Sequence, residues 1–395
     1  MTFFLTTMPQ TLPYTTLFPS VVQEIFLRSL QSTLVHHSLL SVSSSVIDFR
    51  LHRPMDRFQA QYITSLSLIR AALAEDKIDE SLAIGVFLVT WIDAVRGKLD
   101  TTRKHLSGLR LILQTILKTQ KMSGILMQIS WICIRFDWFA SLYLVERPVF
   151  PMVPYVSEEV QRRWVGRAVL SEEMEWALAA FTLENLIHKA CHYAAMIYSL
   201  RCDPDAKVSQ VVDKVEQVVE ILETESRNWI NRPILQEAAQ TQLTAQSIHP
   251  SFTHPSAPQF LSFPPLPVIN TFYANLLNSW RGLQIYISLI HSPQIGPAMP
   301  SRLTHAVEIC RSWTALGNDI TQSEASRVWI MFLVGVAFGG RKRSGEMGAW
   351  IRARVEETST RLPILRRAVE VYGELWEVEG DFWNELEKRR GALLN

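Results

Sequence analysis

The chain has 395 residues, of which 48% are hydrophobic and 12 are tryptophan, so it is not intrinsically disordered and is long enough to bury a large core. Its 39 basic residues are balanced by 38 acidic ones, and a formal net charge of +1 gives no sign of a protein that grips nucleic acid by charge. The length alone would allow about two or three domains.

The N-terminal segment, MTFFLTTMPQTLPYTT, starts with apolar residues but has no basic region, and Pro9 and Pro13 interrupt it. We therefore expect no secretory signal, and we expect residues 1–18 to form a poorly ordered tail. The longest charge-free apolar runs, such as residues 328–340, fall short of the roughly 20 residues that a membrane span requires. We expect a soluble protein with no membrane association.

Hydrophobic residues recur at three- and four-residue steps along almost the whole chain, and no series of alternating strand patterns stands out. This periodicity predicts an all-α fold, in which residues 19–395 form a multi-helix bundle or solenoid-like array around a single large apolar core. The helices are expected at residues 19–40, 56–74, 79–97, 102–118, 123–145, 157–199 with a break, 206–229, 267–292, 301–318, 323–339, 346–358 and 363–390.

The helix predicted at 102–118 lies in the sequence TTRKHLSGLRLILQTILK. Glycine inside a helix costs about 1 kcal/mol relative to alanine, so we expect Gly108 to mark a close contact between two helices. His105 is expected on the helix surface as a packing residue and not as a catalytic base. The apolar residues that form one face of this helix are Leu106, Leu109, Leu113, Ile116 and Leu117.

The sequence HKACH places His188, Cys191 and His192 on one face of a helix, with Glu184 one turn earlier. This spacing could hold a transition metal, because all four side chains would project to one side. The neighbouring apolar residues favour an ordinary amphipathic helix instead, and no second ligand cluster occurs elsewhere. We therefore predict neither a metal nor a cofactor.

Between Ala238 and Trp280 the sequence has no Asp, Glu, Lys or Arg, and its middle is crowded with proline and serine. Because proline removes backbone donors and blocks helix formation, residues 247–266 are predicted to be a loop or linker that divides two helical halves.

The sequence GVAFGGRKRS, residues 335–344, is close to the phosphate-binding loop pattern, but Arg341 stands where that loop needs lysine. We expect these glycines to end a buried helix and the basic residues to lie on a solvated loop.

No nucleophile elbow, zinc-protease motif or paired carboxylates can be singled out, so the chain is not predicted to be an enzyme. The cysteines form no C-x-x-C pair and are expected to be reduced thiols of an intracellular protein: Cys133, Cys191, Cys202 and Cys310.

Residues 87–113, FLVTWIDAVRGKLDTTRKHLSGLRLIL, resemble the regulatory domain of the fungal binuclear zinc-cluster transcription factors. The match is carried by a His-Leu-x-Gly-Leu motif made of His105, Leu106, Gly108 and Leu109. Later segments fit the same family in order, and the resemblance covers roughly residues 20 to 390. These segments are 130–144, 273–290, the apolar run 328–340 with Trp329 and Gly335, 347–357 with Trp350, and a closing helix with Trp376.

The resemblance implies a helical regulatory domain without catalytic residues, which regulates transcription by RNA polymerase II, for instance of a metabolic or secondary-metabolite pathway. It implies protein partners, either a transcription factor or a coactivator, homo- or heterodimerisation, a small-molecule effector, and a location in the nucleus, with the cytoplasm as a second compartment. The six zinc-binding cysteines of that family are absent from this sequence, so we expect no direct binding to DNA by this chain. The alternative is an α-helical enzyme or small-ligand-binding protein whose site is not visible in the sequence.

Overall fold

The computed structural model describes residues 20–50, 56–96, 98–119, 123–144, 146–151, 171–248, 271–295, 300–316, 324–339, 349–351, 353, 374–375 and 380–394. Throughout these ranges the regular secondary structure is helical and no strand forms. The extended pairing within them is an isolated bridge between Gln294 and Asp381. The predicted all-α fold is therefore confirmed.

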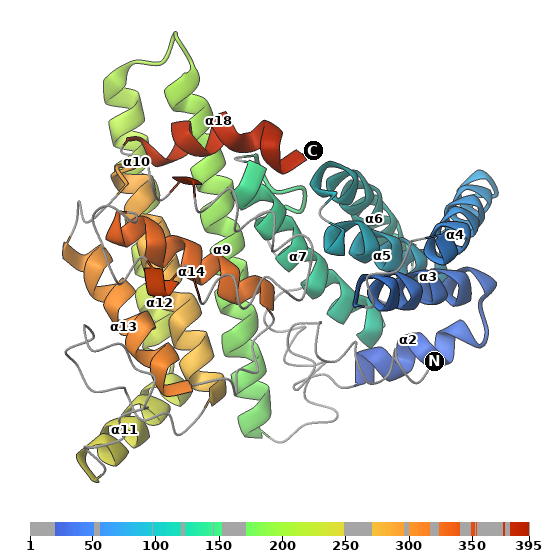
Figure 1. The fold of residues 1–395 in the computed structure, drawn as a ribbon, viewed down its shortest axis with the longest axis horizontal. Coiled ribbons are helices and arrows are strands. Elements are labelled where there is room, and N and C mark those ends of the chain that lie inside the picture. Colours follow the sequence, from blue (N-terminus) through green and yellow to red (C-terminus); the bar gives the residue numbers. More distant parts are fainter. Residues whose placement is uncertain are drawn as a thin grey trace.

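The first group of helices forms one side of the molecule (Figure 1). We call it the N-terminal group, and α3 and α5 pack against each other at its centre, with α4 and α6 on the outside. Its helices are α2 (Ser20–Ser29), α3 (Thr33–Arg50), α4 (Asp56–Ala74), α5 (Glu80–Val95) and α6 (Leu99–Thr119).

The second group forms the other side of the molecule, and we call it the C-terminal group (Figure 1). In it α12 packs against α9, α10, α13 and α14, while α18 returns across the molecule to contact α6 and α7. Its helices are α9 (Ser171–Cys202), α10 (Val208–Ile230), α11 (Pro233–Ile248), α12 (Thr271–His291), α13 (Pro300–Leu316), α14 (Glu324–Phe338) and α18 (Phe382–Leu394).

Helix α7 (Gly124–Leu144) lies between the two groups and contacts both, through α2, α5 and α6 on one side and α9 on the other (Figure 1). One continuous cluster of buried hydrophobic side chains runs through all three parts. Trp138 of α7 packs edge-to-face on Trp329 of α14, with their ring centroids 5.2 Å apart. The single apolar core that the sequence predicts is thus centred on α7.

Residues Gly124–Leu142 of α7 are long and apolar enough to cross a membrane by length and composition, and 89% of this stretch is buried inside the protein. A core helix of a soluble protein passes the same test, so this match is weak support for a span. The expected lack of membrane association remains a prediction.

Several helix ends have identifiable causes. Asp79 caps α5, because its Oδ1 accepts the backbone N–H of Leu82 at 2.9 Å. At the end of α12 the buried guanidinium of Arg302 donates to the carbonyl oxygens of Ser288 and Ser292 at 3.0 and 2.7 Å. Gly339 ends α14 with φ at +74°, as predicted for the glycines of this segment.

The structure corrects three predictions about the elements. The predicted helix 19–40 is two helices, α2 and α3, separated at residues 30–32, and α11 was not predicted. The proline-rich segment does not divide two halves, because α12, which follows it, packs on α9 and α10, which precede it. The predicted tail at 1–18 and residues 249–266 of the predicted loop lie outside the described residues, whereas Ser247 and Ile248, predicted as the start of that loop, end α11.

Candidate functional site

A group of buried polar and charged side chains lies where α6, α7 and α9 meet. Residues 146–151 follow α7 and run back over it, and we call them the strap. Asp137, in the middle of α7, has no exposed surface, and its two carboxylate oxygens accept the backbone N–H groups of Val149 at 2.8 Å and Phe150 at 2.7 Å. Charge-assisted hydrogen bonds of this kind hold the carboxylate in one orientation, so α7 sets the path of the strap.

Two arginines of α6 hold the strap from the side of the N-terminal group. Arg103 donates from Nη2 to the carbonyl oxygen of Arg147 at 2.8 Å and pairs with the Glu146 carboxylate at 3.2 Å. Arg110 donates to the carbonyl oxygen of Val149 at 3.0 Å. Burial lowers the pKa of the Arg103 guanidinium, and the nearby Asp137 and Asp100 carboxylates oppose this shift. The strap is therefore bound to α6 by charged donors.

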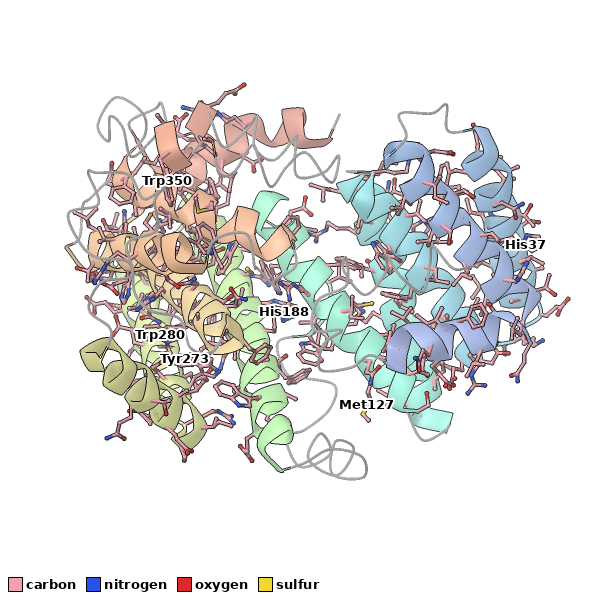
Figure 2. The ribbon with its side chains drawn as sticks, turned by 60° about the horizontal axis from the view of Figure 1, so that its bottom comes forward. His37, Met127, His188, Tyr273, Trp280 and Trp350 are labelled. Carbon is pink, nitrogen blue, oxygen red and sulfur yellow. The ribbon has the colours of Figure 1, made fainter. Side chains whose placement is uncertain are left out.

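Two histidines of α9 support the strap from the side of the C-terminal group, His192 by a direct contact and His188 through Asp137. The Nε2 of His192 lies 2.8 Å from the carbonyl oxygen of Phe150, which can only accept, so this nitrogen carries the proton. The Nε2 of His188 lies 3.2 Å from Asp137 Oδ2. Figure 2 shows His188 on the part of α9 that faces α7, near the middle of the molecule. The strap thus has polar contacts with helices of both groups.

The pKa of His192 is lowered to about 4, mainly by burial, then by His188, whose ring packs edge-to-face on it at 4.8 Å. The Phe150 carbonyl and Asp137 oppose this shift. At neutral pH the His192 imidazole is therefore uncharged, which suits its role as a neutral hydrogen-bond donor to the strap.

A second buried ionic contact joins α7 to α9 on the same face. Arg135 Nη1 lies 3.2 Å from Glu184 Oε1, and the indole Nε1–H of Trp138 donates to Glu184 Oε2 at 2.7 Å. All three side chains are less than a tenth exposed. Removing one partner of such a buried pair typically costs about 3–5 kcal/mol, because the other charge is left unpaired.

Glu184, His188 and Cys191 contact α7, and His192 contacts the strap. Glu184 binds Arg135 and Trp138, His188 faces Asp137, His192 binds the strap, and Cys191 Sγ lies 3.8 Å from the Trp138 carbonyl oxygen. In the described ranges no group of three or more His, Cys, Asp or Glu side chains could hold a metal ion. The expected absence of a metal at HKACH stays a prediction.

The same junction contains an Asp–His pair, which in hydrolases orients a base beside a nucleophile. Here the His188 ring is 2% exposed and its Nε2 points at Asp137. The nearby thiols are fully buried, and burial raises the pKa values of Cys133 and Cys191, so both stay protonated at neutral pH. Among the described residues the pair is a buried contact between α7 and α9.

The sequence predicted His105 on the helix surface, but the structure places it in a partly buried contact. Its Nε2 lies 3.3 Å from Asp93 Oδ2, within ion-pair distance but out of hydrogen-bonding alignment, and its side chain is 24% exposed. Tyr62 of α4 donates to the same Asp93 oxygen at 2.9 Å. His105 therefore helps to join α6 to α5. The sequence did not predict this contact, because helix periodicity does not reveal that Asp93 lies opposite His105.

Gly108 does not mark a close helix contact, and that prediction is wrong. A Cβ atom built there would meet no heavy atom within 4 Å. The close contacts occur at Gly85, where a Cβ would lie 2.8 Å from Leu34 Cγ, and at Gly282, where it would lie 3.2 Å from the Trp329 ring. Leu106 and Leu109 are fully buried as predicted, but Leu117 is 37% exposed.

Sequence reasoning missed the central residues of the junction, Asp137 and Arg135. Both stand in the otherwise apolar segment 124–144, and a charge in such a segment must be paired if the helix is buried. That signal was present in the sequence. The identity of the partners was not, because the strap, α6 and α9 reach α7 only through the tertiary fold.

Comparison with protein-family models, with curated proteins and with solved structures finds no match for this chain. The resemblance to the fungal regulatory domain therefore rests on the sequence segments alone, and the function has to be argued from this chain.

Proposed function

We propose that this chain regulates transcription by RNA polymerase II as a helical regulatory domain of the fungal zinc-cluster type. It acts in the nucleus through a protein partner, a transcription factor or a coactivator, without catalysing a reaction. The observation that carries the proposal is the junction, where the strap is bonded to α6, α7 and α9 by Arg103, Asp137 and His192. Buried acids and bases there hold helices together in the part of the chain that the structure describes.

Such a junction suits a regulator, because it joins two groups of helices through a few specific contacts. Packed interfaces of this kind have discrete arrangements, and a partner that binds one arrangement better shifts the molecule toward it. A partner bound to the N-terminal group would change the arrangement of the C-terminal group through the contacts of Arg103 and Arg110 with the strap. This is the physical basis on which the chain would transmit binding of a transcription factor, a coactivator or a small-molecule effector.

Direct contact with DNA is not part of the proposal. Basic residues on the described helices are interspersed with acids, as in the pairs Arg28–Glu80 at 2.9 Å and Arg311–Glu308 at 2.6 Å. Each pair leaves little net positive charge for phosphates, whereas tight DNA binding neutralises several of them. An anisotropy titration of the purified chain with duplex DNA at about 0.15 M salt is expected to show no sequence-specific binding, and nanomolar sequence-dependent binding would contradict this part of the proposal.

The partner is tested by purifying the tagged full-length chain from nuclei of the cells that make it, and identifying the bound proteins. We expect a transcription factor or coactivator that is retained by the wild type and lost from Arg103→Met, which removes two contacts of α6 with the strap. Lys104→Met is the matched control, because Lys104 is an exposed neighbour on the same helix. Recovery of no transcription-related protein from either form would contradict the proposal.

The alternative function is a small-ligand-binding protein. One observation favours it, a surface hollow beside Arg201 that is lined mostly by aliphatic side chains. A ligand there would serve a regulator equally well as an effector, so the two functions are separated by the loss of a transcription partner and not by ligand binding.

A further inference from the structure

The helices α9 and α10 form a hairpin that projects beyond the end of α12 (Figure 1). Where α12 ends, at His291, the space between α9 and α10 stays open as a hollow of about 390 Å³. This volume lies within the range of small-molecule sites, about 300 to 1,000 Å³. The hollow therefore has room for a compact ligand.

The walls of the hollow are mainly aliphatic. They include Leu200 of α9 and the valines at the start of α10, of which Val208 is 79% exposed and Val212 is 48% exposed. Valine side chains this exposed leave apolar surface in water, and covering it is favourable by about 25 cal/mol per Å². An aliphatic ligand chain lying along α10 would supply that cover.

A cationic side chain also lines the hollow. Arg201, in the last turn of α9, donates from Nη2 to the carbonyl oxygen of Ile290 at 3.2 Å. Its Nη1 is buried without a hydrogen-bond partner, although the Asp381 carboxylate lies near enough to oppose the lowering of the Arg201 pKa by burial. A buried N–H without an acceptor is costly, and a carboxylate is the acceptor that a guanidinium fits best.

We propose that this hollow binds an aliphatic monocarboxylate. The carboxylate accepts a hydrogen bond from Arg201 Nη1 after a turn of this partly exposed side chain, and the aliphatic chain lies against Val208, Val211 and Val212. Glu216 stands exposed at the rim, so a second negative charge on the ligand is repelled, which favours monocarboxylates over dicarboxylates. This binding site does not depend on the proposed role in transcription.

Isothermal titration of the full-length chain with butanoate, octanoate and dodecanoate tests the proposal. Affinity is expected to rise about threefold to fourfold for each methylene that the walls cover, and then to level off when the hollow is full. Octylamine and octanedioate, with the same chain length, are expected to bind at least about tenfold more weakly than octanoate. No binding of octanoate or dodecanoate up to about 1 mM, or equal binding of octylamine, would overturn the proposal.

Two variants locate the site. Arg201→Met keeps the aliphatic stem but removes the guanidinium, and Val212→Asp puts a carboxylate on the exposed wall; each is expected to weaken octanoate binding at least about tenfold. Arg227→Met, an exposed arginine further along α10, is the matched control and should bind like the wild type. Thermal unfolding checks that each variant is folded. If Arg201→Met unfolds because it has lost the contact with Ile290, Val212→Asp alone tests the location of the site. Wild-type affinity in a folded Val212→Asp would overturn the assignment of the site.

Discussion

At the scale of single residues, the fold depends on polar side chains that a periodicity argument treats as interchangeable. Asp137 is fully buried, binds two backbone N–H groups of the strap and faces His188. An amide in its place keeps one acceptor but turns an NH₂ group toward a backbone donor. The carboxylate is therefore needed for its charge as well as for its shape.

We predict that Asp137→Asn lowers the free energy of unfolding by about 2–4 kcal/mol, because a backbone N–H of the strap and the charged network around it lose their acceptor. Asp213→Asn is the control, since Asp213 is exposed on α10 and its change should stay within about 0.5 kcal/mol. Urea unfolding followed by circular dichroism measures both. Equal stability of the two variants would contradict the structural role given to Asp137.

Glycine offers a matched pair at the same scale. Gly108→Ala should raise the free energy of unfolding by about 0.5–1 kcal/mol, because a Cβ there meets nothing within 4 Å and alanine is the better helix former. Gly85→Ala should lower it by about 1–3 kcal/mol, since the new Cβ would lie 2.8 Å from Leu34 Cγ and overpack the contact with α3. Thermal and urea unfolding should give changes of opposite sign, and changes of the same sign would show that these environments are misassigned.

At the scale of elements, the sequence predicted most helices but few of the packing contacts between them. The helix at 56–74 was predicted with its observed bounds, because apolar spacing is a local property of a helix. The break between α2 and α3 was missed since the residues there, Leu30 to Ser32, include neither proline nor glycine. Helix α11 was missed because its polar, charge-poor sequence was merged with the proline-rich segment that follows. The partners of Asp137 and Asp93 depend on how elements meet, which no local pattern contains.

The contacts of α9 and α13 predict a loss of stability in mild acid. Burial is the main cause that lowers the pKa of His192 and of His305 to about 4, helped by His188 for the first and Arg281 for the second. Between pH 6.5 and 4 the unfolded chain therefore binds more protons at these sites than the folded chain, and the stability that is present above pH 6.5 falls as the pH is lowered.

The thermal unfolding midpoint, measured from pH 7 to pH 4, should accordingly fall less steeply for His192→Gln and for His305→Gln than for the wild type. His291→Gln is the control, because His291 is exposed at the end of α12. Parallel curves for the wild type and both glutamine variants would mean that neither histidine is held uncharged by the fold.

At the scale of the whole molecule, two groups of helices share one core, and α7 and the strap lie where they meet. The sequence placed the division at the proline-rich segment, since composition changes there. Composition indicates the local structure of a segment, but not which helices pack together. Helix α12 packs on α9 and α10 because their apolar faces bury each other. The boundary between the groups could be seen only once the helices were arranged in space.

This arrangement predicts the outcome of cutting the chain between α11 and α12. A site for a specific protease placed within residues 249–266 should give two fragments that stay together in size-exclusion chromatography, because α9 and α10 on one fragment pack against α12 on the other. Denaturant should separate them. Fragments that part in native buffer would contradict the packing of α12 on α9 and α10.

The central claim is that this chain changes transcription through a protein partner and needs its junction to do so. The most direct measurement tethers the full chain to an unrelated DNA-binding domain upstream of a reporter gene, in cells that contain the partner, and compares the wild type with Asp137→Asn and Asp213→Asn at equal protein levels. We predict that the wild type and Asp213→Asn change reporter output alike, while Asp137→Asn has lost most of the effect. Reporter output that is the same with and without the tethered wild-type chain would contradict the claim.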